Sequence, residues 1–287
     1  MERTKILKRL DQIKDLPTLP AIAMEVNNML LDYNTSINQL SKTIERDQAI
    51  VSKILKLVNS AFFGLRGKIG NISHAIVVLG FNTIRNAVVS ISIIDAFSVK
   101  KDLDGFDITD FWKHSVAVGV TSKSLAEKIG IHPADNCFVG GLLHDMGKVV
   151  LLRYFNDLFR KVWLAVKENN QTFYEAEKSQ IQIDHALLGG YLARKWQLPR
   201  ALIDAIRYHH NVRPNVNDQH LLMIIHAADI IVNTYAKDSH NDLKLSGIHP
   251  DALNFMGSEL DTLPDWYPDV LLEIESACEF FLEESRK

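Results

Sequence analysis

Hydrophobic residues repeat at helical spacing along most of the chain, and this period favours helices over strands. In TIERDQAIVSKILKLV (43–58), Ile44, Ile50, Val51, Ile54, Leu55 and Val58 share one face, and charged residues take the other. Residues 114–129 and 199–209 have the same period, and Pro199 suits a first helical turn. A period near 3.6 residues is typical of amphipathic helices that bury one face. The sequence therefore predicts a fold dominated by helices.

One segment fits two structures. VVSISIIDAF (88–97) alternates well enough to be a strand, and its β-branched residues favour one. No partner strand is visible elsewhere in the sequence, so we expect a helix here.

Seven residues of metal-ligand type are spread over the second part of the chain. Imidazole and carboxylate are ligands of Fe, Mn, Zn and Ni, and a hydrolytic centre needs several of them to converge with a position left open. The sequence predicts that one metal site gathers these residues from at least four helices: His114, His144, Asp145, His185, His209, His210 and Asp229.

The surroundings of these residues support the prediction. Asp229 lies in LLMIIHAADIIV (221–232), which is apolar on every face, and a buried carboxylate there needs a cation or loses its charge. Asp145 has two oxygens and could bridge two ions. Neighbouring residues on a helix point about 100° apart, so we expect His209 and His210 to differ, one of them serving a second ion or a phosphate.

Each residue taken alone also fits an ordinary role. His114 could be a hydrogen-bonded helix histidine, and His185 could be a helix-start residue after the N-cap Asp184. His209 or His210 could be a cation at a helix C-terminus. His226 is one turn from Asp229 and is expected to support a ligand rather than be one.

The ordered motifs resemble the HDOD branch of the HD superfamily of metal-dependent phosphohydrolases. GLLHDMGK (141–148) carries the His-Asp pair that names the superfamily, and further segments extend the likeness over nearly the whole chain. These segments are LPTLP (16–20), DQAIVSKILKLVNSAFFG (47–64), ISHAIVVLG (72–80), DHALLGGYLARKWQLP (184–199), AIRYHH (205–210) and HAAD (226–229).

The resemblance implies an all-α fold in two parts. Acidic, glycine-containing sequence interrupts the apolar period at KKDLDGFDITD (100–110). We expect an N-terminal helical subdomain over 1–103 and an HD-like, metal-binding helical bundle over 104–287.

The C-terminal half also resembles HD-GYP enzymes, and the resemblance implies roles for single residues. The seven residues named above match the ligands of their metal centre. Lys148 matches a lysine that contacts substrate phosphate, so Lys148 and Asp145 are the expected catalytic residues. Asp110, four residues before His114, could match a third-ion ligand, but an acidic residue in a first helical turn is the favoured role.

The chain departs from the HD-GYP pattern after His210. NVRPNVNDQHLLMII (211–225) contains no GYP motif, and the connection to Asp229 is short. We therefore expect no hydrolysis of cyclic di-GMP, while another phosphate ester remains open.

Two functions follow from the resemblance. The favoured one is an HDOD-type signalling or regulatory protein with a mono- or dinuclear metal site, which acts through a protein partner or a phosphate-containing ligand. The alternative is a metal-dependent phosphohydrolase that acts on a nucleotide or other phosphate ester. A divalent transition metal is expected in either, with Fe or Mn favoured over Ni and Zn.

Composition and charge indicate which partners and which compartment to expect. The net charge of −3 is spread along the chain, which argues against nucleic-acid binding. The two cysteines, Cys137 and Cys278, show no paired or metal-finger spacing, as expected for thiols in a reducing compartment. No apolar run approaches the ~20 residues that span a bilayer, and the N-terminus does not have the pattern of a signal peptide. We expect a cytoplasmic protein that does not enter a membrane.

Overall fold

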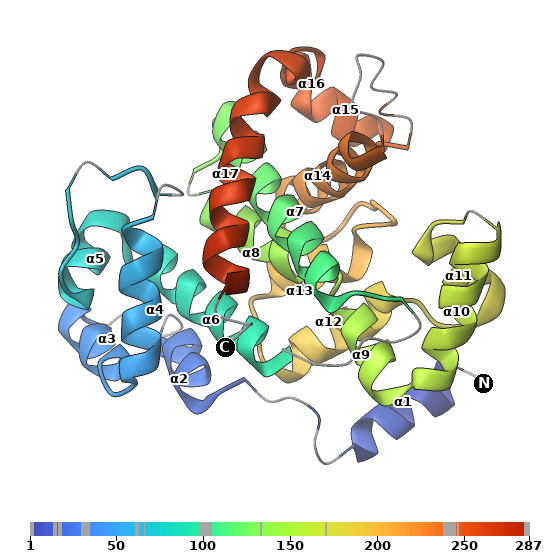
Figure 1. The fold of residues 1–287 in the computed structure, drawn as a ribbon, viewed down its shortest axis with the longest axis horizontal. Coiled ribbons are helices and arrows are strands. Elements are labelled where there is room, and N and C mark those ends of the chain that lie inside the picture. Colours follow the sequence, from blue (N-terminus) through green and yellow to red (C-terminus); the bar gives the residue numbers. More distant parts are fainter. Residues whose placement is uncertain are drawn as a thin grey trace.

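The chain folds into packed helices, and its described part contains no strand (Figure 1). The computed structural model describes residues 3–13, 16, 19–29, 35–60, 63–65, 67–97, 105–132, 134–169, 171–237, 245 and 247–283. The all-α prediction is confirmed.

The first six helices form the N-terminal part. They are α1 (Arg3–Gln12), α2 (Ala21–Met29), α3 (Ile37–Ile44), α4 (Gln48–Val58), α5 (Ile72–Leu79) and α6 (Phe81–Phe97). The ambiguous segment 88–97 is helical, as predicted, because it belongs to the long and largely buried α6. Gly80 separates α5 from α6 with a φ of 88°, a backbone conformation that favours glycine.

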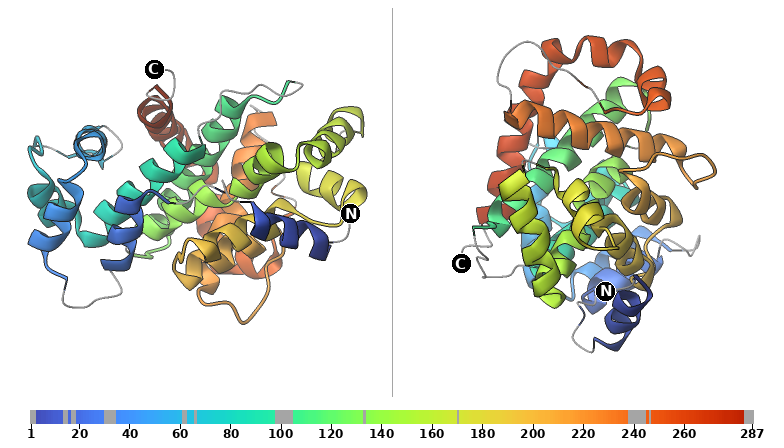
Figure 2. Two further views of the ribbon diagram at one scale, coloured as in Figure 1. Left: turned by 90° about the horizontal axis from the view of Figure 1, so that it is seen from below. Right: turned by 90° about the vertical axis from the view of Figure 1, so that its right-hand side faces the viewer.

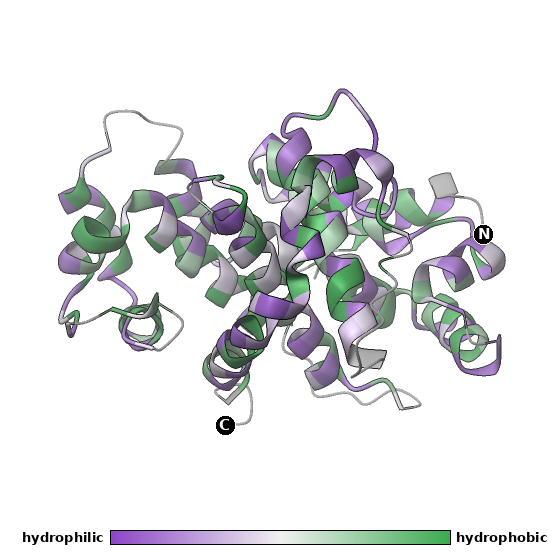
Figure 3. Cartoon of the chain, turned by 90° about the horizontal axis from the view of Figure 1, so that it is seen from above, coloured by the Kyte–Doolittle hydropathy of each residue, from purple (hydrophilic) through white to green (hydrophobic). Residues whose placement is uncertain are grey.

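The remaining helices build the part that holds the predicted ligands. They are α7 (Ile108–Lys128), α8 (Asp135–Leu143), α9 (Met146–Tyr154), α10 (Asn156–Asn169), α11 (Phe173–Gln180), α12 (His185–Lys195), α13 (Arg200–Tyr208), α14 (Gln219–Lys237), α15 (Pro250–Met256), α16 (Ser258–Asp261) and α17 (Leu263–Glu283). Helix α7 packs against α8, α14 and α17, and α12 packs against α9 and α13. Many of their apolar side chains are buried in one hydrophobic cluster. Hydrophobic and hydrophilic residues share the same helices (Figure 3).

Helix α1 is separated from the helices that follow it. It lies beside α12, at the other end of the molecule from α3 to α5 (Figure 2). Arg9 stacks over Phe155, and Asp11 accepts hydrogen bonds from Tyr191 and Lys195 of α12. The chain start therefore packs on the part that holds the predicted ligands.

One hydrophobic cluster contains buried side chains from both predicted subdomains, from Ile6 of α1 to Leu282 of α17. The proposed boundary near 103 falls in residues 98–104, outside the described part, and the division stays a prediction. No single described helix is long and apolar enough to cross a membrane; α5 and α6 together have the length and composition, but they meet at a bend of 120°.

Candidate metal centre

The predicted ligands lie at helix ends and in two helix interiors that meet at one place. His144 follows α8 directly, Asp145 precedes α9, and His185 is the first residue of α12. His209 and His210 follow the end of α13, while His114 and Asp229 lie within α7 and α14. The expectation that at least four helices supply the residues agrees with this arrangement.

Three of these residues form the first group, which contains His114, His144 and Asp229. Nε2 of His114 lies 3.2 Å from Oδ1 of Asp229, and Nε2 of His144 lies 3.6 Å from the same oxygen. Asp229 is only 6% exposed, as the apolar run around it predicts.

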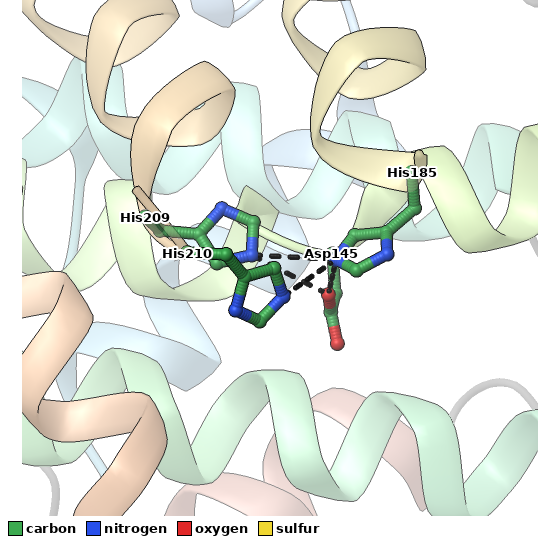
Figure 4. A group of neighbouring side chains, drawn as sticks. All are labelled: Asp145, His185, His209 and His210. Carbon is green, nitrogen blue, oxygen red and sulfur yellow. Dashed lines mark hydrogen bonds and ion pairs between the residues drawn. The ribbon is translucent and has the colours of Figure 1, made fainter. Parts of the chain in front are cut away.

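The second group contains Asp145, His185, His209 and His210 (Figure 4). Nε2 of His185 lies 2.9 Å from Oδ1 of Asp145, 3.3 Å from Nε2 of His209 and 3.0 Å from Nε2 of His210. Three imidazoles and one carboxylate oxygen thus converge on a small volume.

Asp145 joins the two groups through its two oxygens. Oδ1 faces His185 and His209, whereas Oδ2 lies 3.7 Å from Nε2 of His114 and 3.3 Å from Nε2 of His144. Each group can therefore offer four protein donors, with Asp145 shared between them. This is the arrangement expected of a carboxylate that bridges two ions.

His209 and His210 lie in the same group, and the expectation that one of them serves a second ion or a phosphate stays a prediction. Both Nε2 atoms approach Nε2 of His185 and belong to one group. His209 keeps helical dihedral angles, so the two rings meet His185 because the end of α13 packs against α12.

Hydrogen bonds on the outer side of the rings set their direction. Nδ1 of His144 bonds to the carbonyl oxygen of Gly141, at 2.6 Å, and Nδ1 of His209 bonds to that of Ile206, at 2.8 Å. In a neutral imidazole these bonds keep the proton on Nδ1 and leave Nε2 free to bind a metal.

Glu177 holds His185 in the same way, although the sequence analysis did not single it out. Its carboxylate is fully buried in α11 and accepts from the backbone N of His185 at 2.8 Å and from Nδ1 at 2.7 Å. Asn233 was also missed, and it donates to Oδ1 of Asp229 at 2.8 Å. The spacing of one helical turn between Asp229 and Asn233 could have predicted their contact from the sequence. Glu177 and His185 lie on different helices, α11 and α12, so no such spacing links them.

The helices that present the ligands approach one another at glycines. A Cβ atom on Gly147 would lie 1.9 Å from the carbonyl oxygen of His185, and one on Gly141 would lie 2.7 Å from that of Val118. Gly147 therefore allows the start of α9 to lie against the start of α12. This contact brings Asp145 to His185.

Charges in the centre are strongly coupled. Burial disfavours the charged form of His144, but the carboxylates of Asp145 and Asp229 outweigh it and raise its pKa to about 10. Burial also disfavours the charged form of His185, but the carboxylates of Glu177 and Asp145 outweigh it and raise its pKa to about 9. Without a metal, protons on these two rings therefore balance the carboxylates.

The other histidines of the second group behave in the opposite way. Burial lowers the pKa of His210 to about 3 and lowers that of His209 well below its usual range, and neighbouring cationic rings add to both shifts. The pKa values of Asp145 and Asp229 lie well below the usual range, because neighbouring positive charges outweigh their burial. The carboxylates are anions that need compensating charge.

Lys148 lies at the edge of the first group. Its Nζ donates to Oδ2 of Asp145 at 2.5 Å, and its side chain is 17% exposed. Burial would lower the pKa of Lys148, but Asp145 outweighs it and raises the pKa. An ammonium fixed beside the centre, on a side chain that is partly exposed, is suited to contact an anionic ligand.

The residues present fit a metal ion. Nε2 of His144 is buried beside two carboxylates, yet within the described residues it makes no hydrogen bond to either. Its contacts are ion pairs with the two carboxylates, and a cation shared by the three side chains would replace the ring proton and bind this nitrogen. The His/Asp cluster therefore indicates a metal ion, and the donor set alone does not identify the element.

The remaining candidates have ordinary roles. Asp110 is exposed in the first turn of α7 and pairs with Lys113, in agreement with the role favoured from the sequence. Asp184 caps α12, as expected. Nδ1 of His226 bonds to the carbonyl oxygen of His209 at 2.7 Å, so it supports a predicted ligand. Cys137 is buried and Cys278 partly buried, and both thiols are free.

The chain is thus an all-helical protein that carries a His/Asp cluster suited to a metal ion. The chain belongs to the HDOD family, because the HDOD domain model matches residues 16–212. A curated relative, an uncharacterized protein of Treponema pallidum (strain Nichols), is 29% identical over 204 residues. These residues make up 70% of this chain and 39% of that protein, so the chain spans well under half the relative's length.

Solved structures share the fold. An HDOD domain protein of unknown function from Geobacter sulfurreducens has a TM-score of 0.80 and 24% identity, covering 97% of this chain and 98% of that one. A Shewanella amazonensis protein, provisionally named a phosphohydrolase, has a TM-score of 0.76 and 21% identity, covering 95% of this chain and 97% of that one. A Marinobacter aquaeolei VT8 protein, provisionally named a signal transduction protein, has a TM-score of 0.73 and 16% identity over 97% and 65%. At these identities the likeness shows the fold alone.

Proposed function

We propose that the chain is a metal-dependent phosphohydrolase with a dinuclear centre held by His114, His144, Asp145, His185, His209, His210 and Asp229. One observation carries the proposal: the two oxygens of Asp145 face two separate groups of donors, 3.3 Å from His144 on one side and 2.9 Å from His185 on the other. Four protein donors for each ion leave positions free when the metal prefers six, as Fe and Mn do. A purely structural site would be closed.

A bound pair of such ions supplies a nucleophile near neutral pH and neutralises phosphoryl charge. In the reaction, the oxygen of water forms a bond to phosphorus, the ester P–O bond breaks, and the alcohol leaves with a proton from that water. Lys148 holds an ammonium group beside Oδ2 of Asp145, where it can neutralise charge that develops on a phosphoryl oxygen. His114 is 22% exposed and lines a groove, and Lys148 is 17% exposed, so a ligand would approach the centre from the side of these two residues.

A regulatory role, which the resemblance favours, is the second candidate. Helix α8, which ends next to His144, packs on α6 of the N-terminal part. Buried Arg85 of α6 donates to the side chain of Asn136 of α8 at 3.2 Å, and Thr83 donates to Asp135 at 2.7 Å. This contact offers a direct physical connection between the metal centre and helices that a protein partner could bind.

The proposal is tested with protein loaded with Mn or Fe and supplied with phosphomonoesters, nucleotides and cyclic di-GMP. We expect turnover of at least one ester and none of cyclic di-GMP, since the GYP segment is absent. Lys148→Ala should keep the metals and lose roughly 100-fold or more in kcat, the usual effect of removing one group that stabilises transition-state charge. Lys161→Ala, which removes an exposed lysine of α10, is the matched control.

Two results would count against hydrolysis. The first is a metal-loaded protein with no turnover above the metal-free blank on any ester. The second is a Lys148→Ala variant as active as Lys161→Ala. Either result, with metal still bound, would favour the regulatory role.

A further inference from the structure

A groove of about 770 Å³ runs between α7 and α17, beside α14. Its floor is apolar, because Ala117, Val232 and Ile274 pack together there. Leu271 and Leu272 of α17 line its side and are 44% and 66% exposed. Large apolar side chains that line a concavity of this size are typical of ligand sites.

The groove reaches the metal centre through His114, which lines the groove and also belongs to the first group of ligands. Its Nε2 lies 3.2 Å from Asp229, and Val232 of the floor is one helical turn after Asp229. A molecule bound to the first group therefore has an apolar surface next to it, one imidazole ring away.

Charged side chains along the groove limit the charge of the ligand part that can bind there. Asp110, Glu275 and Glu279 line it. The lysine on the same lining, Lys113, pairs with Asp110 at 2.8 Å. Acidic side chains repel a second anionic group, and the apolar floor and leucines favour hydrocarbon, so the part of a ligand in the groove is apolar and carries no negative charge.

We propose that the substrate is a phosphate ester of an apolar alcohol, with its phosphate at the His114 side of the metal centre and its hydrocarbon chain in the groove. The proposal rests on the hydrolytic function proposed above for the phosphate end. The groove should also favour ligands with a longer hydrocarbon chain. Binding measurements test this preference without any need for turnover.

The test uses alkyl phosphonates, which keep the phosphate-like head and resist hydrolysis, from methyl to octyl, titrated calorimetrically into manganese-loaded protein. Full burial of a methylene group improves affinity about fourfold, and a half-open groove should give about twofold. Octyl phosphonate should therefore bind roughly 100-fold more tightly than methyl phosphonate. The double variant Leu271→Ser/Leu272→Ser should lose most of that difference.

Leu164→Ser is the matched control, since Leu164 of α10 is 51% exposed and lies outside the groove lining. It should bind every phosphonate as the wild type does. All three leucines are exposed, so serine should leave the fold intact.

Cys278 gives a local readout, because it lines the groove while the other cysteine, Cys137, is buried. Saturating octyl phosphonate should slow alkylation of Cys278 by N-ethylmaleimide several-fold, measured by mass spectrometry. Methyl phosphonate should have little effect, because it does not extend into the groove.

Equal affinity for methyl and octyl phosphonate would overturn the proposal, and phosphate esters could then still be hydrolysed. A chain-length effect that survives in the double variant would also overturn it, since the chain would bind elsewhere. So would a wild-type dimer that the double variant converts to a monomer without any change in phosphonate affinity, because a second copy would then be the occupant. Chain-length dependence that the double variant loses, with no turnover of any ester, would support the groove and reject hydrolysis.

Discussion

At the scale of single residues, the candidate centre depends on how each ring is held as much as on which rings are present. Carbonyl oxygens orient His144 and His209, and a buried carboxylate orients His185. These partners decide which nitrogen faces the centre. They also raise the basicity of that nitrogen.

We predict that Glu177→Gln weakens metal binding in the His185 group and leaves the first group intact. Glutamine keeps one oxygen for the backbone N of His185 but loses the charge that polarises the ring. Removing such a partner typically costs 10- to 100-fold in metal affinity, so we expect about that loss at one of two sites. Calorimetric titration of the metal-free protein with manganese measures the affinity of each site.

Glu168→Gln, which changes an exposed carboxylate of α10, is the control and should match the wild type. The assignment of Glu177 would be wrong if its variant filled both sites with wild-type affinity.

At the scale of helices, the centre is built where helix ends meet. The starts of α9 and α12 carry Asp145 and His185, and they approach closely enough that Gly147 has no room for a side chain. Any added atom there must push one of the two helices away.

Gly147→Ala should therefore destabilise the fold and separate the two ligands. Overpacking usually lowers the free energy of unfolding by about 1–3 kcal/mol. Because the added Cβ would lie 1.9 Å from the carbonyl oxygen of His185, we expect a loss at or above the upper end of that range. The melting temperature and the metal content should both fall. Gly70→Ala, where a Cβ would meet nothing within 4 Å, should change neither; equal melting temperatures for the two variants would contradict the close contact.

The sequence predicted the helices and the seven ligand-type residues, but only part of the geometry. Asp229 could be found because a carboxylate in an apolar run needs a partner. The convergence of His209 and His210 on His185 could not, because it depends on how α13 packs against α12. Glu177 was missed because its contact with His185 depends on how α11 packs, which no local pattern encodes.

At the scale of the whole molecule, one apolar core joins the N-terminal helices to the helices that present the ligands. The buried centre therefore couples metal binding to the stability of the fold, since an ion that binds only the folded state stabilises it. The charges of the metal-free centre make the same stability depend on pH.

We predict that the metal-free protein is most stable near pH 6.5, the ordinary histidine pKa. The pKa values of His144 and His185 are raised to about 10 and 9, so their contribution is complete below 6.5 and is lost as pH rises through those values. The pKa values of His209 and His210 are lowered, so unfolding takes up protons below 6.5 and stability falls there.

Melting temperatures of chelator-treated protein from pH 5 to 10 test this prediction. Metal-loaded protein should lose the decline above pH 7, because the ligating rings are then neutral in the folded state. A metal-free protein whose stability rises steadily from pH 7 to 10 would contradict the assigned charges.

We infer that Asp145 would bridge two ions, and the metal content of the Asp145→Asn variant distinguishes this role from that of an ordinary buried carboxylate. Asparagine keeps the shape of the side chain and removes the charge and one of the two ligand oxygens. The wild type, purified with manganese or iron and measured by elemental analysis, should hold about two ions per chain, one for each group of donors. Folded Asp145→Asn should hold fewer than one ion per chain, and an unchanged metal content in that variant would mean that Asp145 does not bridge two ions.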